Sequence, residues 1–300
     1  MPTRFLLSLA GLPLFVLSNC GKSPTSPVDP IGDAVLVMAS DWTGQYDIWL
    51  RDANDHLTDL TPSQPYIDHG PRWTPDGQHI VFWSGRESIP YLYIMNPDGS
   101  GVTKFIDATS SSGGVSWSPD GLQIALQGHE DIWIANADGT QATRLTFGGG
   151  DSPAWSPDGQ KIAFTCFVGT NPPNREICTI NIDGTDTTNL TNNFGNEYSP
   201  AWSPDGQRIV FISDRQAGQR WEVFIMNADG SEQTNLTHQS RDGIPMGARN
   251  PIWTSDGQLI VFAMGTFIAG ESQLYAMNPD GSNRQAIPNT QGAAWVSFRP

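Results

Sequence analysis

Short apolar runs separated by polar turns recur along the chain from about residue 34 onward. Runs such as Ile80 to Trp83 and Ile209 to Ile212 are followed, after loops of variable length, by second runs such as Tyr91 to Met95 and Val223 to Met226. No stretch of this region keeps the 3.6-residue period of an amphipathic helix. The pattern therefore predicts short β-strands and almost no helix.

Two turn sequences punctuate these runs. The first follows an anchor tryptophan and reads Ser/Thr-Pro-Asp-Gly, in which proline presets φ, aspartate bonds the local backbone and glycine takes the left-handed position. The anchors are Trp73, Trp117, Trp155, Trp202, Trp253 (with Ser255 in place of proline) and, in an eroded copy, Trp295. The second turn is Asn-x-Asp-Gly before a last short strand, at Asn96, Asn136, Asn227 and Asn278. Four strands and two tight turns per repeat, with a period near 40 residues, predict propeller blades.

The number of repeats predicts how the ring closes. Each blade takes its strand A at the tryptophan, then strands B, C and D. The N-terminal part supplies B (34–40), C (47–51) and D (56–60) with no A before them, and the C-terminus supplies a lone A (293–298). Joined in one blade, they remove the exposed edges that an open array would leave. The prediction is an all-β, six-bladed propeller of four-stranded blades, closed by a mixed blade.

These repeats resemble the PD40 (WD40-like) repeats of TolB-type propellers. The resemblance rests on the Trp-Ser-Pro-Asp-Gly-x-x-Ile-Ala-Phe pattern, on the Ser213-Asp214-Arg215 ending of one B strand and on the Asn-x-Asp-Gly tail that runs into Leu-Thr, and it covers residues 33–300. The α/β domain that precedes the propeller of full-length TolB has no room before these repeats, so the resemblance implies the propeller domain alone. The same repeat also builds oligogalacturonate lyases and the propellers of some serine peptidases, so the fold does not fix the function.

The N-terminus reads as an export signal. Arg4 precedes an apolar segment that ends near Leu17 and is too short to span a bilayer comfortably. The following Leu17 to Gly21 resembles a bacterial lipobox, which predicts a signal peptide at 1–19, a lipidated Cys20, a Ser/Pro-rich linker at 20–32 and the propeller at 33–300. The alternative is an ordinary cleaved signal with an incidental Cys20. The localisation expected from the first interpretation is a periplasmic or outer-membrane lipoprotein.

The charge balance limits the partners. The chain has 16 basic and 31 acidic residues, a net charge of −15, which argues against nucleic acid and anionic membrane surfaces. Many of the aspartates belong to the repeated turns, so the acidity does not itself indicate a binding site. We expect a monomer whose contact with a membrane is limited to the lipid at Cys20.

The two other cysteines, Cys166 and Cys178, lie on strands B and C of one blade. A register taken by analogy with the short hairpin of the third repeat places Cys178 opposite Ala163, so that Cys166 points to the other face. This predicts buried thiols and no disulfide, in spite of the oxidising compartment.

Loops of variable length between strands D and A and between B and C share one rim, where binding sites usually lie. We expect the residues four and five places before each anchor tryptophan to form a ring around the central opening, either as a polar funnel for a peptide, sugar or cation or as a self-satisfied salt-bridged rim. Arg72 stands next to its tryptophan, where the other repeats have serine, alanine or isoleucine, and needs a partner or a wet channel. Trp42 and Trp221, in or beside B–C loops, are candidate anchors for a partner or caps of blade ends. The predicted partner- or ligand-binding residues are Asp68, His69, Arg72, Asp151, Glu197, Tyr198, Arg249, Trp42 and Trp221.

Motifs for catalysis and metal binding are weak. His69, His129 and His238 belong to one rim but to different blades, and no close spacing of histidines and carboxylates supports a metal site. No Gly-x-Ser-x-Gly motif occurs. We expect no metal, no cofactor and no catalytic residue.

The sequence thus leaves three hypotheses. The first is a non-catalytic TolB-like propeller that binds an envelope protein or peptide at the loop-rich face and channel mouth. The second is an enzyme acting on polysaccharide, similar to oligogalacturonate lyase, with His69, His129 and Arg72 in its funnel. The third is a purely structural or ligand-sensing propeller.

Overall fold

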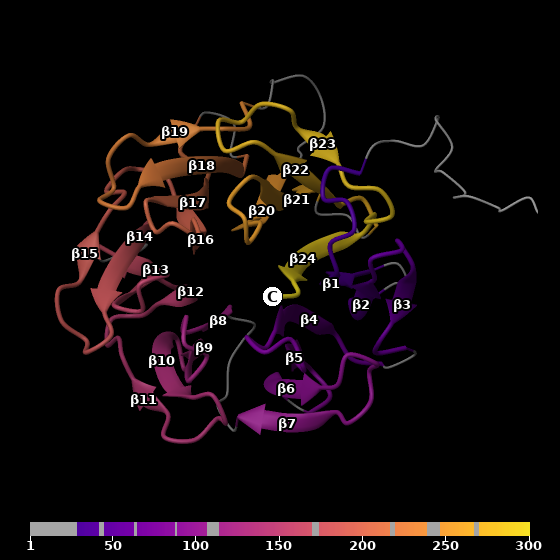
Figure 1. Ribbon diagram of the computed structural model, residues 1–300. Coiled ribbons are helices and arrows are strands. Elements are labelled where there is room, and N and C mark those ends of the chain that lie inside the picture. Colours follow the sequence, from indigo (N-terminus) through magenta and orange to yellow (C-terminus); the bar gives the residue numbers. More distant parts are fainter. Residues whose placement is uncertain are drawn as a thin grey trace, which may run out of the picture.

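The computed structural model describes residues 29–41, 45–62, 65–87, 89–106, 114–169, 174–216, 220–238, 247–266 and 270–300. Every element in these ranges is a β-strand. The strands form six four-stranded antiparallel sheets, which stand as blades around a central axis (Figure 1). The predicted six-bladed propeller is confirmed.

Each blade runs outward from its A strand, next to the axis. Blade 1 contains β24 (Ala293–Phe298), β1 (Leu36–Ser40), β2 (Asp47–Arg51) and β3 (Leu57–Asp59). Blade 2 contains β4 (Asp68–Trp73), β5 (Ile80–Ser84), β6 (Tyr91–Met95) and β7 (Thr103–Ile106). Blade 3 contains β8 (Val115–Trp117), β9 (Gln123–Gly128), β10 (Asp131–Asn136) and β11 (Thr143–Arg144). Blade 4 contains β12 (Asp151–Trp155), β13 (Lys161–Val168), β14 (Asn174–Asn181) and β15 (Thr188–Asn189). Blade 5 contains β16 (Glu197–Trp202), β17 (Arg208–Ser213), β18 (Glu222–Asn227) and β19 (Thr234–Asn235). Blade 6 contains β20 (Gly247–Trp253), β21 (Ile260–Gly265), β22 (Gln273–Met277) and β23 (Gln285–Ala286).

Blade 1 closes the ring with strands from both ends of the chain, as predicted. Strand β24 pairs antiparallel with β1, and Leu36 lies opposite Phe298. One residue beyond this pair, the Arg299 N–H donates to the Val35 carbonyl at 2.9 Å. The ring therefore has no open sheet edge at the point where the described chain begins and ends.

The repeated turns explain why the blades are so alike. In the first turn of blade 2, the Thr74 hydroxyl and the Gln78 N–H both donate to one Asp76 carboxylate oxygen, at 2.6 and 3.0 Å. The glycine of the second turn, Gly99, has φ +82° and packs on the preceding blade. A Cβ atom at Gly99 would lie 2.6 Å from the Leu60 carbonyl oxygen, so glycine is required both for the turn and for the close approach of two blades.

A second repeated device fixes strand D to strand C. In blade 3 the Thr146 hydroxyl accepts from the Ile132 N–H at 2.9 Å and donates to the Asp131 carboxylate at 3.0 Å. Blade 4 repeats it with Ile177 and Glu176 around Thr191. The Leu-Thr segments recognised in the sequence therefore place a threonine where it satisfies a buried acid and a backbone donor together.

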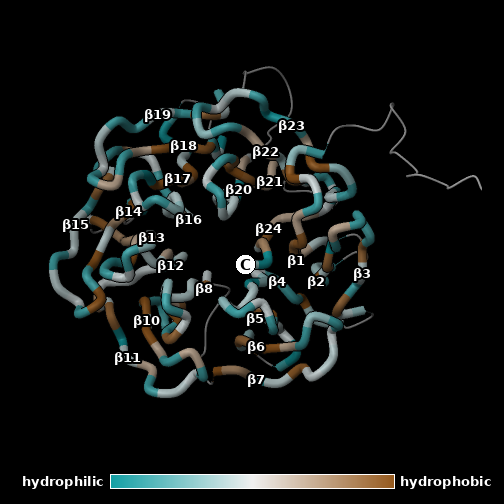
Figure 2. Tube along the Cα trace, in the orientation of Figure 1, coloured by the Kyte–Doolittle hydropathy of each residue, from teal (hydrophilic) through white to brown (hydrophobic). Residues whose placement is uncertain are grey.

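The hydrophobic core lies between neighbouring blades. Val37 and Ala39 of blade 1, for example, pack in one cluster with Trp73 and Phe82 of blade 2. In Figure 2 the strands next to the axis are mostly pale or teal, and the hydrophobic stretches concentrate further out. The strands that border the axis are therefore less apolar than the B and C strands that follow them, as β12 is compared with β13 and β14.

The described chain begins with contacts to blade 1. Asp29 forms an ion pair with Arg51, whose side chain is buried, and Ile31 packs against the cluster between blades 6 and 1. The end of the predicted linker is thus tied to the propeller. The predicted signal peptide, Cys20 and Trp42 lie outside the described residues. Within those residues no helix is long and apolar enough to cross a membrane.

The prediction of free cysteine thiols is wrong, because Cys166 and Cys178 form a disulfide across β13 and β14. Thr179, not Cys178, pairs with Ala163, while Cys178 pairs with Phe164. Both cysteines therefore point to the same face, with Cα atoms 5.7 Å apart, within the usual range for a disulfide. The register is constant at the end that carries the turns: Asn136 pairs with Gln123 in blade 3, and Asn181 with Lys161 in blade 4. Counting from that end gives the observed pairing.

Candidate functional site

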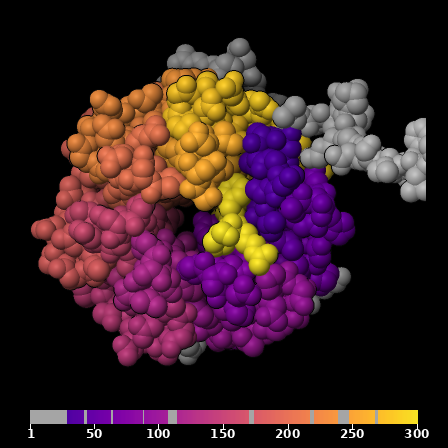
Figure 3. All heavy atoms as spheres, in the orientation of Figure 1, coloured from indigo at the N-terminus to yellow at the C-terminus, as the bar shows by residue number. Residues whose placement is uncertain are grey.

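A cavity of about 460 Å³ lies on the propeller axis and is the candidate functional site. Five blades contribute to its wall the residues three and one places before their anchor tryptophans. These are Gly70 and Arg72, Gly114 and Ser116, Ser152 and Ala154, Ser199 and Ala201, and Asn250 and Ile252. Figure 3 shows the propeller hollowed at its centre, with the C-terminal residues against the hollow. Among these, Val296 and Arg299 line a smaller pocket together with Arg72.

A bulge in strand A turns these residues toward the axis. In blades 2, 4, 5 and 6 the pairing of strand A with strand B shifts just where an x-Pro dipeptide stands. The residue before that proline is left-handed, with φ +51° at Ser152, +53° at Ser199 and +49° at Asn250. This conformation costs a non-glycine residue roughly 1 kcal/mol. The cavity is therefore bordered by three strained polar residues.

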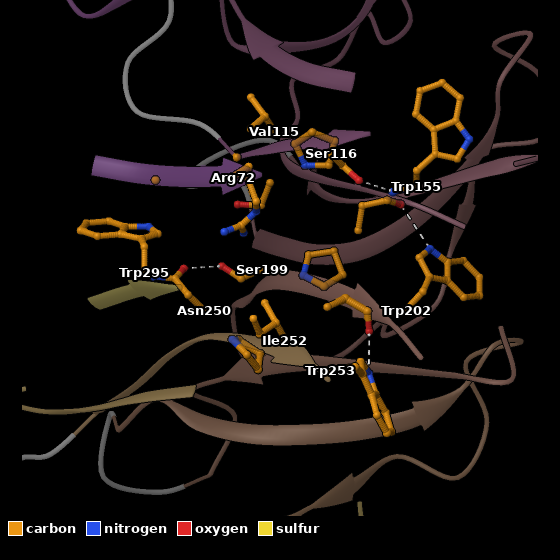
Figure 4. Close-up of a pocket in the computed structure, with 18 of the residues that line it drawn as sticks. Arg72, Val115, Ser116, Trp155, Ser199, Trp202, Asn250, Ile252, Trp253 and Trp295 are labelled. Atoms are coloured by element: carbon orange, nitrogen blue, oxygen red, sulfur yellow. Dashed lines mark hydrogen bonds between the residues drawn. The ribbon is translucent and has the colours of Figure 1, made fainter. Parts of the chain in front are cut away.

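Arg72 is the cation in the wall of the cavity. Its Nη1 donates to the Val296 carbonyl at 2.9 Å and to the Pro71 carbonyl at 3.1 Å, which ties β4 to β24. No carboxylate of the described residues forms an ion pair with it. Burial lowers the pKa of Arg72 to about 10, so it remains charged near neutral pH. The expected need for a partner or a wet channel is met by backbone carbonyls and the open cavity (Figure 4).

The acids five places before the tryptophans lie inside the blades. Asp68 is fully buried, and Arg86 reaches its carboxylate at 3.3 Å. Glu197 is equally buried, and Arg215 reaches it at 3.2 Å. In both blades a serine at the end of strand B belongs to the cluster, and the arginine stacks on aromatic rings, Tyr93 in one blade and Phe224 in the other. The Ser-x-Arg ending of the B strand therefore supplies the arginine and a serine hydroxyl of a buried ion-pair cluster.

Glu197 also meets a second carboxyl group across a blade boundary. Burial raises the pKa of Glu197 to about 7, and a hydrogen bond to Glu176 adds to the rise, while Ser213 and Arg215 oppose it. Glu176 is itself buried and accepts from the Asn174 amide and the Asn193 N–H, at 2.8 and 3.0 Å. The seam between blades 4 and 5 thus contains two neighbouring acids, of which Glu197 is protonated in mildly acidic solution.

Burial shifts the pKa of two of the predicted ring residues. The His69 ring lies 5.3 Å from the Trp295 ring, and burial lowers the pKa of His69 to about 4. Burial also raises the pKa of Asp151, while interactions with Ser152, Thr165 and Arg175 lower it in part. His69 is therefore a neutral packing residue at neutral pH, while Asp151 stands directly before one of the strained residues of the cavity wall.

The remaining described candidates gather on the loop side of blades 5 and 6. Tyr198 and Trp221 form an edge-to-face pair with ring centres 4.9 Å apart, and both pack on the cluster between these blades. The Arg175 guanidinium lies over the Tyr198 ring at 5.1 Å. Arg249 donates to the Thr266 carbonyl at 2.6 Å and interacts with Tyr46. These residues are partly exposed and lie at the margin of the site.

The residues that line the cavity therefore stand three and one places before the tryptophans, not four and five as expected. Of the predicted binding residues that the structure describes, Arg72 alone lines the cavity. The x-Pro dipeptides at a constant distance before the tryptophans were the signal for the true lining positions. Two exposed phenylalanines in D–A loops were also missed, Phe147 (78% exposed) and Phe194 (107%). Each stands beside a glycine in an otherwise polar loop.

The histidines of the enzyme hypothesis do not converge. His69 packs on Trp295, while His129 packs beside Trp133 in blade 3. In the described part of the chain, no group of three or more histidine, cysteine or acidic residues could hold a metal ion.

Comparison with known proteins identifies the repeat. Residues 147–265 match the family model described as PD40, TolB beta propeller domain. The chain is 32% identical over 124 residues to "Protein TolB homolog" of Chlorobium luteolum, and 33% identical over 107 residues to "Tol-Pal system protein TolB" of Anaeromyxobacter dehalogenans. These matches cover 39% and 34% of this chain, but only 27% and 24% of the relatives.

Solved structures agree with the fold. TolB from Acinetobacter baumannii superposes with a TM-score of 0.69 at 22% identity, over 91% of this chain and 68% of that one. Oligogalacturonate lyase from Vibrio parahaemolyticus superposes with a TM-score of 0.53 at 13% identity, over 84% of this chain and 72% of that one. At such low sequence identities, both superpositions show a shared fold and nothing further. The resemblance inferred from the Trp-Ser-Pro-Asp-Gly motifs is confirmed by the family model and the two relatives: residues 147–265 match the PD40, TolB beta propeller domain, within a six-bladed propeller.

Proposed function

We propose that this TolB-like propeller is a non-catalytic module of the bacterial cell envelope that binds a protein or peptide at its loop-rich face and channel mouth. The exposed phenylalanines of the loop side, Phe147 and Phe194, carry the proposal. The axial cavity adds strained polar residues and a desolvated arginine along the channel, and its wall also reaches the Pro-Asp-Gly turns of the other rim at Pro157, Pro204 and Ser255. The name of one relative, a Tol-Pal system protein, points in the same direction. An exported chain anchored through Cys20 belongs to the same proposal.

The contact surface would consist of the exposed and half-exposed residues of the loop side. Phe147 and Phe194 present large apolar side chains, and Tyr198, Trp221 and Arg249 offer the residue types that often dominate interfaces. The fully buried Asp68 and Glu197 would act indirectly, by holding the arginines that shape this side.

Exposed apolar residues on the two rims offer a matched test. A variant with Phe147→Ala and Phe194→Ala would be compared with Leu122→Ala, because Leu122 is 67% exposed but stands in a Pro-Asp-Gly turn on the other rim. None of these truncations should cost much stability. Envelope extract would be passed over each immobilised protein, and a captured partner would be quantified against the wild type. We expect the loop-side variant to lose the partner and the Leu122 variant to retain it; the reverse result, or equal retention, would contradict the proposal.

The alternative enzyme acting on polysaccharide has weaker support. It rests on the fold shared with oligogalacturonate lyase, whereas His69 is buried and neutral at neutral pH. Incubation of the wild type with oligogalacturonate, followed by absorbance of unsaturated products, tests it directly.

A further inference from the structure

The donors inside the axial cavity indicate what the cavity recognises, an inference that rests on the proposed function. The Nη1 of Arg72 is committed to the carbonyls of Pro71 and Val296. That tether fixes the plane of the guanidinium group. The group points into the cavity that Ser116, Ser199 and Asn250 also line (Figure 4).

The opposite edge of the guanidinium is available to a ligand. Nε and Nη2 of Arg72 make no hydrogen bond to any residue that the structure describes, and no carboxylate there pairs with them. These two nitrogens present parallel N–H groups, the arrangement that a planar carboxylate accepts with both oxygens. A tetrahedral anion can accept from the same edge, so sulfate serves as a competing probe in the binding test.

The wall adds a hydroxyl donor and apolar surface. Ser116 Oγ accepts from the Trp155 N–H at 2.9 Å, which leaves its own hydrogen to donate. The Ser199 hydroxyl instead donates to the Asn250 side-chain oxygen at 3.4 Å, and the Asn250 amide donates to the Ala294 carbonyl at 2.9 Å. Trp155, Trp202, Trp253 and several prolines supply apolar contacts for a hydrocarbon stem. A volume of about 460 Å³ lies within the usual range of small-molecule sites, roughly 300–1,000 Å³.

We propose that the axial cavity binds a carboxylate group through the Nε–Nη2 edge of Arg72 and the Ser116 hydroxyl, and that the group is the side chain of an acidic residue in the bound peptide. The net charge of −15 repels anions at long range. Affinity must therefore come from short-range contacts, and salt that screens the repulsion should not abolish binding.

Binding of two probe pairs to the purified full chain tests the proposal. Glutarate and its uncharged diamide, glutaramide, stand for a free carboxylate and its control. A capped pentapeptide of alanines with a central glutamate, and its glutamine counterpart, stand for the peptide side chain. Calorimetry would be paired with tryptophan fluorescence, because four tryptophans border the cavity.

Three variants separate contact from charge. Arg72→Gln removes the cation, and Arg72→Lys retains the charge without the parallel N–H groups. Arg284→Gln changes the net charge equally at an exposed turn outside the cavity. Since Arg72 also ties β4 to β24, urea unfolding of each variant would establish that binding is measured on folded protein.

We expect glutarate and the glutamate peptide to bind the wild type and Arg284→Gln with equal affinity. Their affinity for Arg72→Gln should be at least about tenfold lower, and their affinity for Arg72→Lys should lie between the two. Glutaramide and the glutamine peptide should not bind. Equal binding by Arg72→Gln, no saturable binding of either carboxylate, or equally tight binding of sulfate would overturn the proposal.

The peptide arm separates this inference from the proposed function. Arg72-dependent binding of glutarate without the glutamate peptide would retain the carboxylate site and refute the peptide as its source. The opposite result is also informative. If the variant with Phe147→Ala and Phe194→Ala loses the captured partner, but no protein binds glutarate or the glutamate peptide, the proposed function is retained and the carboxylate site is refuted.

Discussion

Replacing Glu197 by glutamine should change how the stability of the propeller depends on pH. Glu197 is fully buried between blades 4 and 5, beside Glu176, and is reached by Ser213 and Arg215. Glutamine keeps the shape of the protonated acid but cannot ionise. The variant therefore isolates the free-energy cost of ionising this carboxyl group in the folded protein.

The sign and the size follow from the pKa of Glu197. Burial and Glu176 raise that pKa from 4.5 to about 7, so between these pH values the folded protein holds a proton that the unfolded chain has released. The stability from this proton is fully present below pH 4.5 and is lost as the pH rises through 7. At about 1.4 kcal/mol per pKa unit, the loss is about 3 kcal/mol.

Urea unfolding followed by tryptophan fluorescence, from about pH 4 to about pH 8, would measure the effect. The free energy of unfolding of the wild type minus that of Glu197→Gln should fall by about 3 kcal/mol over this range. The exposed Glu232, replaced by glutamine, serves as the control, because it also removes one carboxyl group but lies outside this buried seam. A difference that stays flat for Glu197, or rises with pH, would mean that the Arg215 ion pair outweighs burial and Glu176, and the reasoning would be refuted.

Three further changes test other features of the fold. His69→Phe keeps an aromatic ring on Trp295 but cannot titrate. Because burial lowers the pKa of His69 to about 4, the free energy of unfolding of the wild type should fall by about 3 kcal/mol relative to this variant as the pH drops from 6.5 to 4. The same urea assay would measure this slope, which is opposite in sign to that of Glu197. Replacing Cys166 and Cys178 together by serine should lower the free energy of unfolding by about 3 kcal/mol, and a reductant should bring the wild type to the same value; intact-mass analysis of the alkylated protein reports the disulfide. Gly99→Ala should cost more than about 1 kcal/mol, since its φ is +82° and the new Cβ would meet the Leu60 carbonyl, whereas Gly148→Ala, with no heavy atom within 4 Å of the new Cβ, should be nearly neutral; equal melting temperatures for the two would contradict the packing argument.

The architecture could be predicted from the sequence because the turns repeat. A Pro-Asp-Gly turn has one local geometry whatever surrounds it, and each copy marks the boundary between strands A and B. The unmatched strands at the two ends then left a mixed blade as the way to close the ring. The same reasoning failed for Cys166 and Cys178, because their register was not counted from the constant turns.

The site was harder to predict because a bulge decides which residues face the axis. Regular alternation along strand A assigns faces by counting from the tryptophan, but the shift between His69 and Arg72 breaks that count. Asp68 and Glu197 consequently became buried partners of Arg86 and Arg215, which no spacing within strand A could reveal. The partners come from the far end of strand B, and only the folded blade brings them together.

One position of the cavity wall, directly before the anchor tryptophan, is left undetermined by the repeat. Where a turn or a core position meets the neighbouring blade, packing dictates the same residue type in copy after copy, as with Gly99 against Leu60. The position directly before the tryptophan meets the cavity, and packing there accepts serine, alanine or isoleucine. An arginine at that position in blade 2 loses hydration, as its lowered pKa indicates, and recovers only two carbonyl contacts. Stability alone gives no reason to place a cation there, whereas a carboxylate ligand would supply the missing partner.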